Sequence, residues 1–373
     1  MNIARVQSWV LRVPFHYPLF EETSYATTVL LEIETEEGLK GHAMSGYPMA
    51  HGIRELVNRN VAPLVKGKDA MAIEEVRAAI LWGLSAKYFA GAFACAASLV
   101  DIALWDIKGK ATGQPVWKLL GGSRSRCPAY ITFGLGTYTQ EQLVEVARML
   151  VAQGQSRLKM VVAAAPNEEI FGRPSDERIA EDIARVAAVR GAIGPKVELM
   201  VDANKNASLT QALQLARGME PYNLTWFEDP LLQADPRLMA QLRQKSSIPL
   251  AAGSTGTSDL LYFREYLLHN SVDYLQPNVR DIGGYTGGLK AAAVAQAFNI
   301  QIQMGGNWPH INMHLHGGAP NGGRVEFHWQ GWHVVEVLFD GAPPPTNGWV
   351  TLPEALGLGF TPKEGIVREY AVE

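Results

Sequence analysis

The chain has 373 residues, 47% of them hydrophobic and 19% charged, and its formal net charge is −4. These values are typical of a globular protein and exclude a disordered or collagen-like chain. The length exceeds one ordinary core, so we expect a large domain with a smaller partner, and the acidic balance provides no positive field for nucleic acid.

The cysteines, the N-terminal residues and the most apolar stretch bear on where the protein works. Cys95 and Cys127 are too few for a disulfide framework or a thiolate zinc site. The first 15 residues lack the basic start and long apolar core of a secretory signal. Residues 89–105 are apolar but contain Asp101, which favours a buried helix over a membrane span. We therefore expect a cytoplasmic protein with no membrane contact.

The first part of the chain changes from a strand pattern to a helix pattern. Residues 28–35 form an apolar run before the turn at 36–38, which is typical of an antiparallel hairpin. From residue 51 to about 121 the apolar positions follow a helical period. The sequence thus predicts an N-terminal α+β capping domain over residues 1–124.

Beyond the glycine pair at 121–122, short β-branched strands alternate with helices, as in βα units. Eight strands would close a parallel barrel of the TIM type over residues 125–345. We expect a loop over the barrel mouth at 163–177, and a tail at 346–373 that returns to the capping domain. The strands are predicted near residues 128–132, 157–162, 197–202, 224–228, 248–252, 272–276, 300–304 and 324–327.

Two acidic side chains end neighbouring predicted strands. Asp202 closes VELMVD and Glu228 closes LTWFE, so both belong at the C-terminal rim, where βα barrels place their reactive groups. Two carboxylates with open positions beside them suit Mg²⁺. Alternatively, each acid caps the helix that follows its strand.

Four motifs together resemble a known family. SLVDIALWDIKGKATGQPVWKLLGG at 98–122, VDAN at 201–204, WFEDP at 226–230 and IGGYTG at 282–287 are similar, in the same order, to the mandelate racemase and muconate-lactonizing branch of the enolase superfamily. The resemblance covers nearly the whole chain. It implies an enolase-like (β/α) barrel in which three acids hold one Mg²⁺ and a side chain removes the α-proton of a carboxylate substrate.

The resemblance assigns the metal site with one departure. Asp202 and Glu228 match the first two ligands and stand 228 − 202 = 26 residues apart. The same step again reaches Ser254, where the family usually has Glu. Because a hydroxyl is a neutral and weaker ligand, we expect weaker metal binding.

The family's proton-transfer groups are also changed. Arg157-Leu158-Lys159 stands where the family often carries Lys-x-Lys on the second strand, and Lys159 matches the base. Arg157 could lower the pKa of that lysine or bind a carboxylate. A lysine facing solvent is the alternative. Asn278 stands where the family's second base has its Asp partner, and Gly306 or Asn307 stands where its His belongs.

Other residues complete the predicted site. His310 could reach the mouth from its loop, whereas its i+4 neighbour His314 is expected to pack against the barrel wall. Glu326 matches an eighth-strand acid that donates a hydrogen bond to the substrate carboxylate when burial raises its pKa. The predicted substrate-binding residues are Arg157, Asn204, Asn278, Asn307 and Tyr47.

The leading hypothesis is a dehydratase that acts on a sugar acid or related hydroxy acid, because racemization needs a base on each face of the α-carbon. A racemase or epimerase that uses His310, and a carboxylate-binding protein without turnover, are the alternatives. The resemblance also implies a small-molecule carboxylate substrate and a homo-oligomer.

Overall fold

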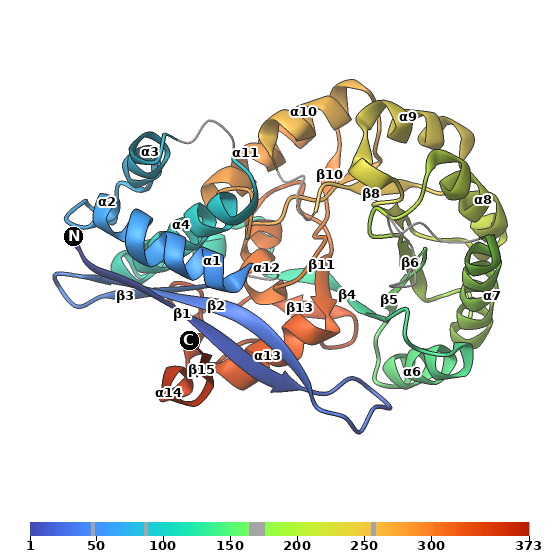
Figure 1. The fold of residues 1–373 in the computed structure, drawn as a ribbon, viewed down its shortest axis with the longest axis horizontal. Helices are drawn as coiled ribbons and strands as arrows, with labels where there is room; N and C mark the ends of the chain where they lie inside the picture. Colours follow the sequence, from blue (N-terminus) through green and yellow to red (C-terminus); the bar gives the residue numbers. More distant parts are fainter. Residues whose placement is uncertain (46–48, 86–88, 164–175, 255–258, 373) are drawn as a thin grey trace.

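The protein is seen here as a computed structural model that describes residues 1–45, 49–85, 89–163, 176–254 and 259–372. Two parts lie side by side, with the N-terminal sheet and helices on one side and a ring of strands and helices on the other (Figure 1). This arrangement agrees with the predicted capping domain and barrel.

The capping domain begins with an antiparallel sheet of β1 (Ile3–Phe15), β2 (Ser24–Thr35) and β3 (Lys40–Ser45). Gly38, with a φ of +82°, forms the predicted turn between β2 and β3. Gly41 is required by packing, since a Cβ there would lie 2.1 Å from the carbonyl oxygen of Ala103. The hairpin prediction is confirmed.

Helices cover one face of this sheet (Figure 1). The longest lies against β3 and against α11 of the barrel, and its buried residues run almost without a break from Ala94 to Ile107. It is a core helix, as predicted, and no helix in the described ranges is long and apolar enough to cross a membrane. The helices are α1 (Ala50–Glu55), η1 (Leu56–Val61), α2 (Ala62–Val65), α3 (Ile73–Gly83), α4 (Gly91–Thr112) and α5 (Val116–Leu119).

The barrel contains the eight predicted parallel strands, several of them shorter than expected. Neighbouring strands pair in the order β10-β9-β8-β7-β6-β5-β4-β11. The ends of this series meet through hydrogen bonds from Ile302 N to Asn321 O (3.0 Å) and from Met304 N to Arg324 O (2.9 Å). The strands are β4 (Arg126–Gly134), β5 (Arg157–Val161), β6 (Glu198–Asp202), β7 (Phe227–Glu228), β8 (Leu250–Ala252), β9 (Tyr274–Leu275), β10 (Gln301–Ile302) and β11 (Val325–His328).

Helices alternate with these strands and form the outer layer (Figure 1). Side chains cap the first turns of α6, α8, α9 and α10. In α6, for example, Thr139 and Gln142 form a capping box. The helices are α6 (Gln140–Ala152), α7 (Asp176–Ile193), α8 (Leu209–Met219), η2 (Glu220–Tyr222), η3 (Leu232–Ala234), α9 (Pro236–Lys245), α10 (Leu260–Leu268), α11 (Gly284–Ala297), α12 (Pro309–Gly318) and α13 (Trp329–Leu338).

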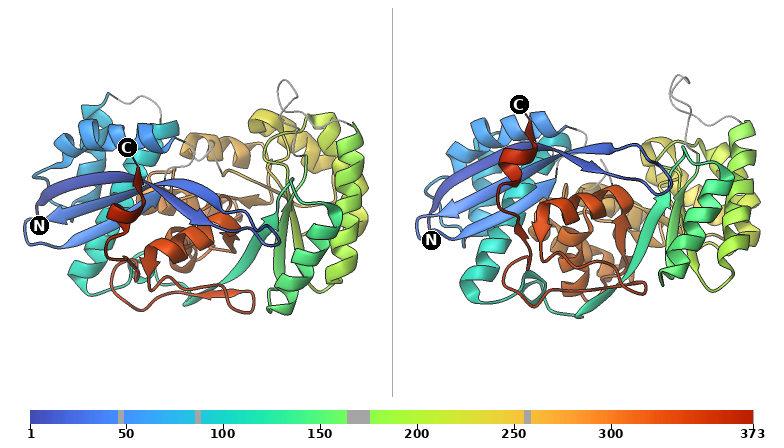
Figure 2. Two further views of the ribbon diagram at one scale, coloured as in Figure 1. Left: turned by 60° about the horizontal axis from the view of Figure 1, so that its bottom comes forward. Right: turned by 90° about the horizontal axis from the view of Figure 1, so that it is seen from below.

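The C-terminal segment connects the two parts. β12 (Phe339–Asp340) pairs with β14 (Thr361–Pro362), and β13 (Trp349–Thr351) pairs antiparallel with β4 of the barrel. After α14 (Ile366–Tyr370), β15 (Ala371–Val372) pairs with β1, so the chain ends beside the capping sheet (Figure 2).

Candidate active site

The inward side of the barrel changes character at its C-terminal end. Tyr130, Met200, Trp226 and Ala251 form a buried cluster inside the barrel, with Tyr274 packed against it. Side chains two residues apart on a strand share a face, so the residue two positions after each of these also points inward, nearer the mouth. Most of these positions are polar: Thr132, Asp202, Glu228 and Gln276.

Three carboxylates from three strands meet at Lys159. Its Nζ lies 3.0 Å from Asp202 Oδ2, 2.7 Å from Glu228 Oε1 and 3.0 Å from Glu326 Oε1. Lys159 is 1% exposed. An ammonium group has three N–H donors, and here each has a carboxylate within reach.

Neighbouring groups orient these carboxylates. Trp226 Nε1 donates to Glu228 Oε2 at 3.0 Å, and the backbone N of Asn204 donates to Asp202 Oδ1 at 2.8 Å. Thr132 donates to Glu326 Oε1. Asp202 and Glu228 are therefore held with one oxygen anchored and the other directed at a shared point.

Burial and charge act against each other in this cluster. Burial alone would lower the pKa of Lys159, but the carboxylates of Asp202, Glu228 and Glu326 raise it well above its ordinary value. Burial raises the pKa of Glu228 well above its ordinary range, although Lys159 opposes this. The lysine is thus a fixed cation in this arrangement.

The strand register places Lys159 deeper than the predicted base position. Lys159 pairs with Met200, whereas Val161 pairs with Asp202 at the rim. We infer that Lys159 matches the first lysine of the family's Lys-x-Lys pair and that Val161 occupies the second place. The β5 residue at the level of Asp202 is Val161, and its side chain cannot accept a proton.

Ser254 lies two residues after β8, at the predicted third ligand position, but its hydroxyl contacts a different neighbour. Its Oγ donates to Asp229 Oδ2 at 3.1 Å, and Lys205 Nζ donates to its carbonyl oxygen at 2.8 Å. Burial raises the pKa of Asp229 to about 6, and Lys205, 3.7 Å away, opposes the rise. Within the described residues, no three His, Cys, Asp or Glu side chains are arranged to hold a metal ion.

Arg157 lies at the opposite end of β5, so its predicted role in substrate binding is wrong. Its Nε donates to Glu198 Oε1 at 2.8 Å and one terminal nitrogen donates to Gly348 O at 2.7 Å. Its guanidinium also lies over the ring of Trp349, on β13. Parallel strands place their first residues at the N-terminal end of the barrel, away from the mouth.

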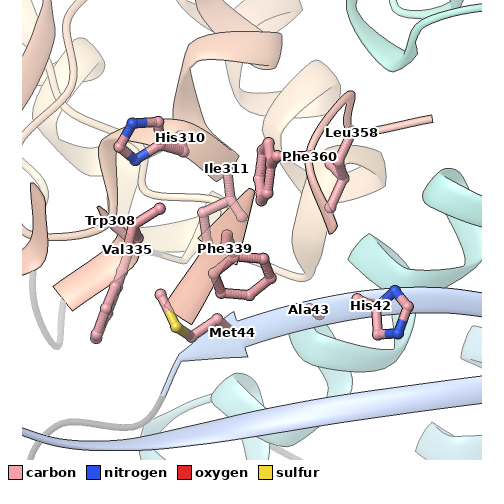
Figure 3. A pocket seen from close by; sticks show the side chains of 10 residues that line it. All are labelled: His42, Ala43, Met44, Trp308, His310, Ile311, Val335, Phe339, Leu358 and Phe360. Carbon is pink, nitrogen blue, oxygen red and sulfur yellow. The ribbon is translucent and has the colours of Figure 1, made fainter. Parts of the chain in front are cut away.

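The prediction that His310 reaches the mouth is also wrong. The side chain is 1% exposed, its Nε2 lies 3.0 Å from Pro343 O, and its ring packs against Phe327 and Phe360. Successive side chains of a strand point to opposite faces, and Glu326 faces inward, so Phe327 faces outward. Figure 3 shows His310 in an apolar pocket that also includes Met44 of the capping sheet. Burial lowers its pKa to about 4.

The predicted amide contacts differ in their availability. Asn278 is fully buried; it donates to Gly305 O and Asn307 O, and its Oδ1 accepts from Arg280 N and Asn312 Nδ2, so it is not open to a substrate as predicted.

Asn307 is partly exposed and its Oδ1 accepts from Trp308 N. Asn204 is exposed at the rim, with a φ of +48°. Tyr47, and most of the predicted loop at 163–177, lie outside the described residues.

Three buried polar residues near the site were not predicted from the sequence. Asp229 Oδ1, both amide atoms of Gln276, and His328 Nδ1 are buried without a hydrogen-bond partner among the described residues. For Gln276 and His328, the signal was the strand alternation: each lies two residues after an inward residue, Tyr274 or Glu326.

The capped parallel barrel, with carboxylates at the C-terminal ends of its strands, agrees with the enolase-like arrangement that the sequence motifs predict. The family model for the mandelate racemase / muconate lactonizing enzyme N-terminal domain matches residues 2–121, and the enolase C-terminal domain-like model matches residues 142–366. The chain therefore belongs to the enolase superfamily, in its mandelate racemase and muconate lactonizing enzyme group.

Similar proteins include several that act on sugar acids. The arabinonate dehydratase of Saccharolobus solfataricus is 28% identical over 92% of this chain and 90% of its own length. The 3,6-anhydro-alpha-L-galactonate cycloisomerase of Streptomyces coelicolor is 30% identical over 96% of both chains. Among solved structures, the L-talarate dehydratase of a Polaromonas species, complexed with Mg and L-glucarate, has a TM-score of 0.86 at 28% identity, covering 100% of this chain and 98% of that one.

Proposed function

We propose that the protein is a dehydratase that binds a sugar acid at the barrel mouth, forms its enolate and expels the β-hydroxyl group. The observation that carries this proposal is the convergence of Asp202, Glu228 and Glu326 on Lys159. The dehydratases among the similar proteins support the same reaction class. The amide of Gln276, which has no hydrogen-bond partner within the described part of the chain, adds a group suited to a substrate hydroxyl.

Charge in the site favours a divalent cation. Among the residues that the structure describes, the four carboxylates of Asp202, Glu228, Asp229 and Glu326 form ion pairs with two ammonium groups, those of Lys159 and Lys205. Two carboxylates with substrate or water oxygens suffice for Mg²⁺, so Asp202 and Glu228 would hold it. When bound, Mg²⁺ supplies the positive charge that lowers the cost of an enolate. Since Ser254 is neutral, we propose weak binding.

The structure supports changed roles for two predicted residues. We assign Lys159 as a fixed cation that compensates the carboxylates of the site, instead of the predicted proton acceptor, because its N–H groups are directed to carboxylates. Glu326 keeps its proposed contact with the substrate carboxylate, since its Oε2 has no partner among the described residues. Asn204 and Asn307 remain proposed substrate contacts at the rim.

The test is incubation of the purified protein and MgCl₂ with galactarate, gluconate, arabinonate and related acids. We expect a 2-keto-3-deoxy acid from at least one of them, detected as its semicarbazone and by mass spectrometry. A complete panel without keto-acid product would contradict the proposal.

A binding protein without turnover is the second candidate. It is favoured by the valine at 161 and by the internal bonding of Asn278, which together remove two positions for a base. Solvent deuterium exchange at the α-carbon separates the two functions: a dehydratase exchanges or eliminates, whereas a binding protein shows a calorimetric Kd alone. With His310 outside the barrel, we do not propose racemization.

A further inference from the structure

His328 is the last residue of β11 and faces the interior of the barrel. Phe327 packs outward against His310 and Trp332, so the residues on either side of it, Glu326 and His328, point inward. In the strand register Thr132 pairs with both His328 and Lys159. The imidazole therefore lies at the level of Lys159 and one pleat above Glu326.

The surroundings of His328 are those of the charged cluster. The charges that act on its ring are those of Glu326, Lys159 and Asp202, which belong to three different strands. Its Nδ1 is buried and has no hydrogen-bond partner among the residues that the structure describes. Burial lowers the pKa of His328, which keeps the imidazole neutral and able to accept a proton near pH 7.

The capping domain reaches the barrel beside His328. The next residue, Trp329, donates from Nε1 to His16 O at 2.8 Å, and Tyr138 Oη donates to Pro18 O at 2.8 Å. Both acceptors lie in the segment between β1 and β2, at the end of the hairpin that extends toward the barrel (Figure 1). The segment between β1 and β2 therefore contacts residues that follow β4 and β11, at the C-terminal end of the barrel where His328 lies.

We propose that His328 is the proton-transfer residue of this site. The inference rests on the proposed dehydratase function and answers a question that this function raises, since Val161, Asn278 and His310 leave the expected base positions without a base. A histidine on the eighth strand fills that role from a different wall of the barrel.

The step balances with one imidazole. His328 accepts the α-proton while the C–H electron pair moves into the carboxylate to form the enolate. The imidazolium then returns that proton to the β-hydroxyl as the C–O bond breaks, giving water and an enol that becomes the keto acid. Because one group serves both transfers, the α-proton and the hydroxyl leave from the same face of the substrate.

The main test compares wild type, His328→Gln and the surface control His269→Gln in D₂O with galactarate, gluconate and arabinonate. His269 is 42% exposed on the outside of the barrel. We expect keto-acid formation, together with any α-deuterium exchange, to fall at least about 100-fold in His328→Gln, while the calorimetric Kd for the acid stays within about threefold. The control should match wild type.

Two results would overturn the inference in distinguishable ways. Keto-acid formation by His328→Gln within about threefold of wild type removes His328 and leaves the dehydratase proposal standing. If wild type forms no keto acid and shows no α-deuterium exchange with any of the acids, the dehydratase function is removed and, with it, this role.

A second measurement uses the wild-type protein alone. The rate at which diethyl pyrocarbonate carbethoxylates His328 is followed by peptide mass spectrometry. A saturating acid should slow modification at least about tenfold, and equal rates with and without the acid would contradict the proposal.

Discussion

Lys159 Nζ and Glu228 Oε1 lie 2.7 Å apart, and both side chains are 1% exposed. Neither charge is solvated by bulk water, so each depends on its protein partners for compensation. The same lysine also serves Asp202 and Glu326. The folded state of the barrel mouth therefore depends on the charge of Lys159, in addition to any role of this lysine in the chemistry.

We predict that Lys159→Met destabilises the protein by about 3–5 kcal/mol, because it leaves three buried carboxylates without their cation. Urea unfolding followed by circular dichroism measures the change. Adding Glu228→Gln to this variant should recover part of the loss, since it removes one uncompensated charge.

Lys290→Met is the matched control. Lys290 pairs with Glu74 at 2.6 Å, but both side chains are exposed, so its loss should cost no more than about 1 kcal/mol. Equal losses for the two lysine variants would contradict the role assigned to Lys159.

Ser254→Glu should restore the third carboxylate and tighten Mg²⁺ binding at least about tenfold, which corresponds to about 1.4 kcal/mol. Isothermal titration calorimetry of wild type and variant measures this directly. Ser254→Ala, which adds no charge, should leave the Kd within about twofold. An unchanged Kd in Ser254→Glu would show that Ser254 does not adjoin the metal position.

Asp101 predicts a pH dependence at the junction between α4 and α11. Its Oδ1 accepts from Thr286 N at 3.2 Å, and burial raises its pKa from 3.8 to about 7. Between these values the folded state holds a proton that the unfolded chain has released, so this group lowers stability as the pH rises from about 4 to 7. Asp101→Asn should remove up to about 1.4 kcal/mol per pH unit of that slope.

The measurement for Asp101 is urea unfolding at pH 5, 6, 7 and 8. The difference between variant and wild type isolates this carboxyl group from the histidines whose buried rings act in the opposite sense. Asp340→Asn, at an exposed position, should keep the wild-type slope. Parallel curves for Asp101→Asn and wild type would refute the assignment.

The fold was predictable because it depends on local patterns. Strand alternation, glycine turns and βα spacing predicted the hairpin, the eight strands and the positions of Asp202 and Glu228 at strand ends. Each of these signals lies within a short stretch of the chain. The alternation and the helical period follow directly from which side chains are buried.

The site was less predictable because it depends on depth and direction. The sequence does not show how deep in the barrel Lys159 lies. The strand register does: Val161 pairs with Asp202 at the rim, so Lys159 lies one pleat below the rim. His310 follows a strand end closely, but the helix α12 turns it to the outer side of β11. His328 was overlooked because its role depends on sharing a face with Glu326.

Gln276 should reveal a conflict between stability and binding. It is fully buried, and both of its amide atoms lack a hydrogen-bond partner among the described residues, so the folded protein bears the cost of desolvating them. Gln276→Leu removes that cost and should raise the free energy of unfolding by about 1 kcal/mol. The same change should weaken the calorimetric Kd for galactarate at least about tenfold, because a buried hydroxyl of the acid loses its partner. A variant that is less stable, or that binds the acid as tightly as wild type, would show that this amide is part of the scaffold and not of the binding surface.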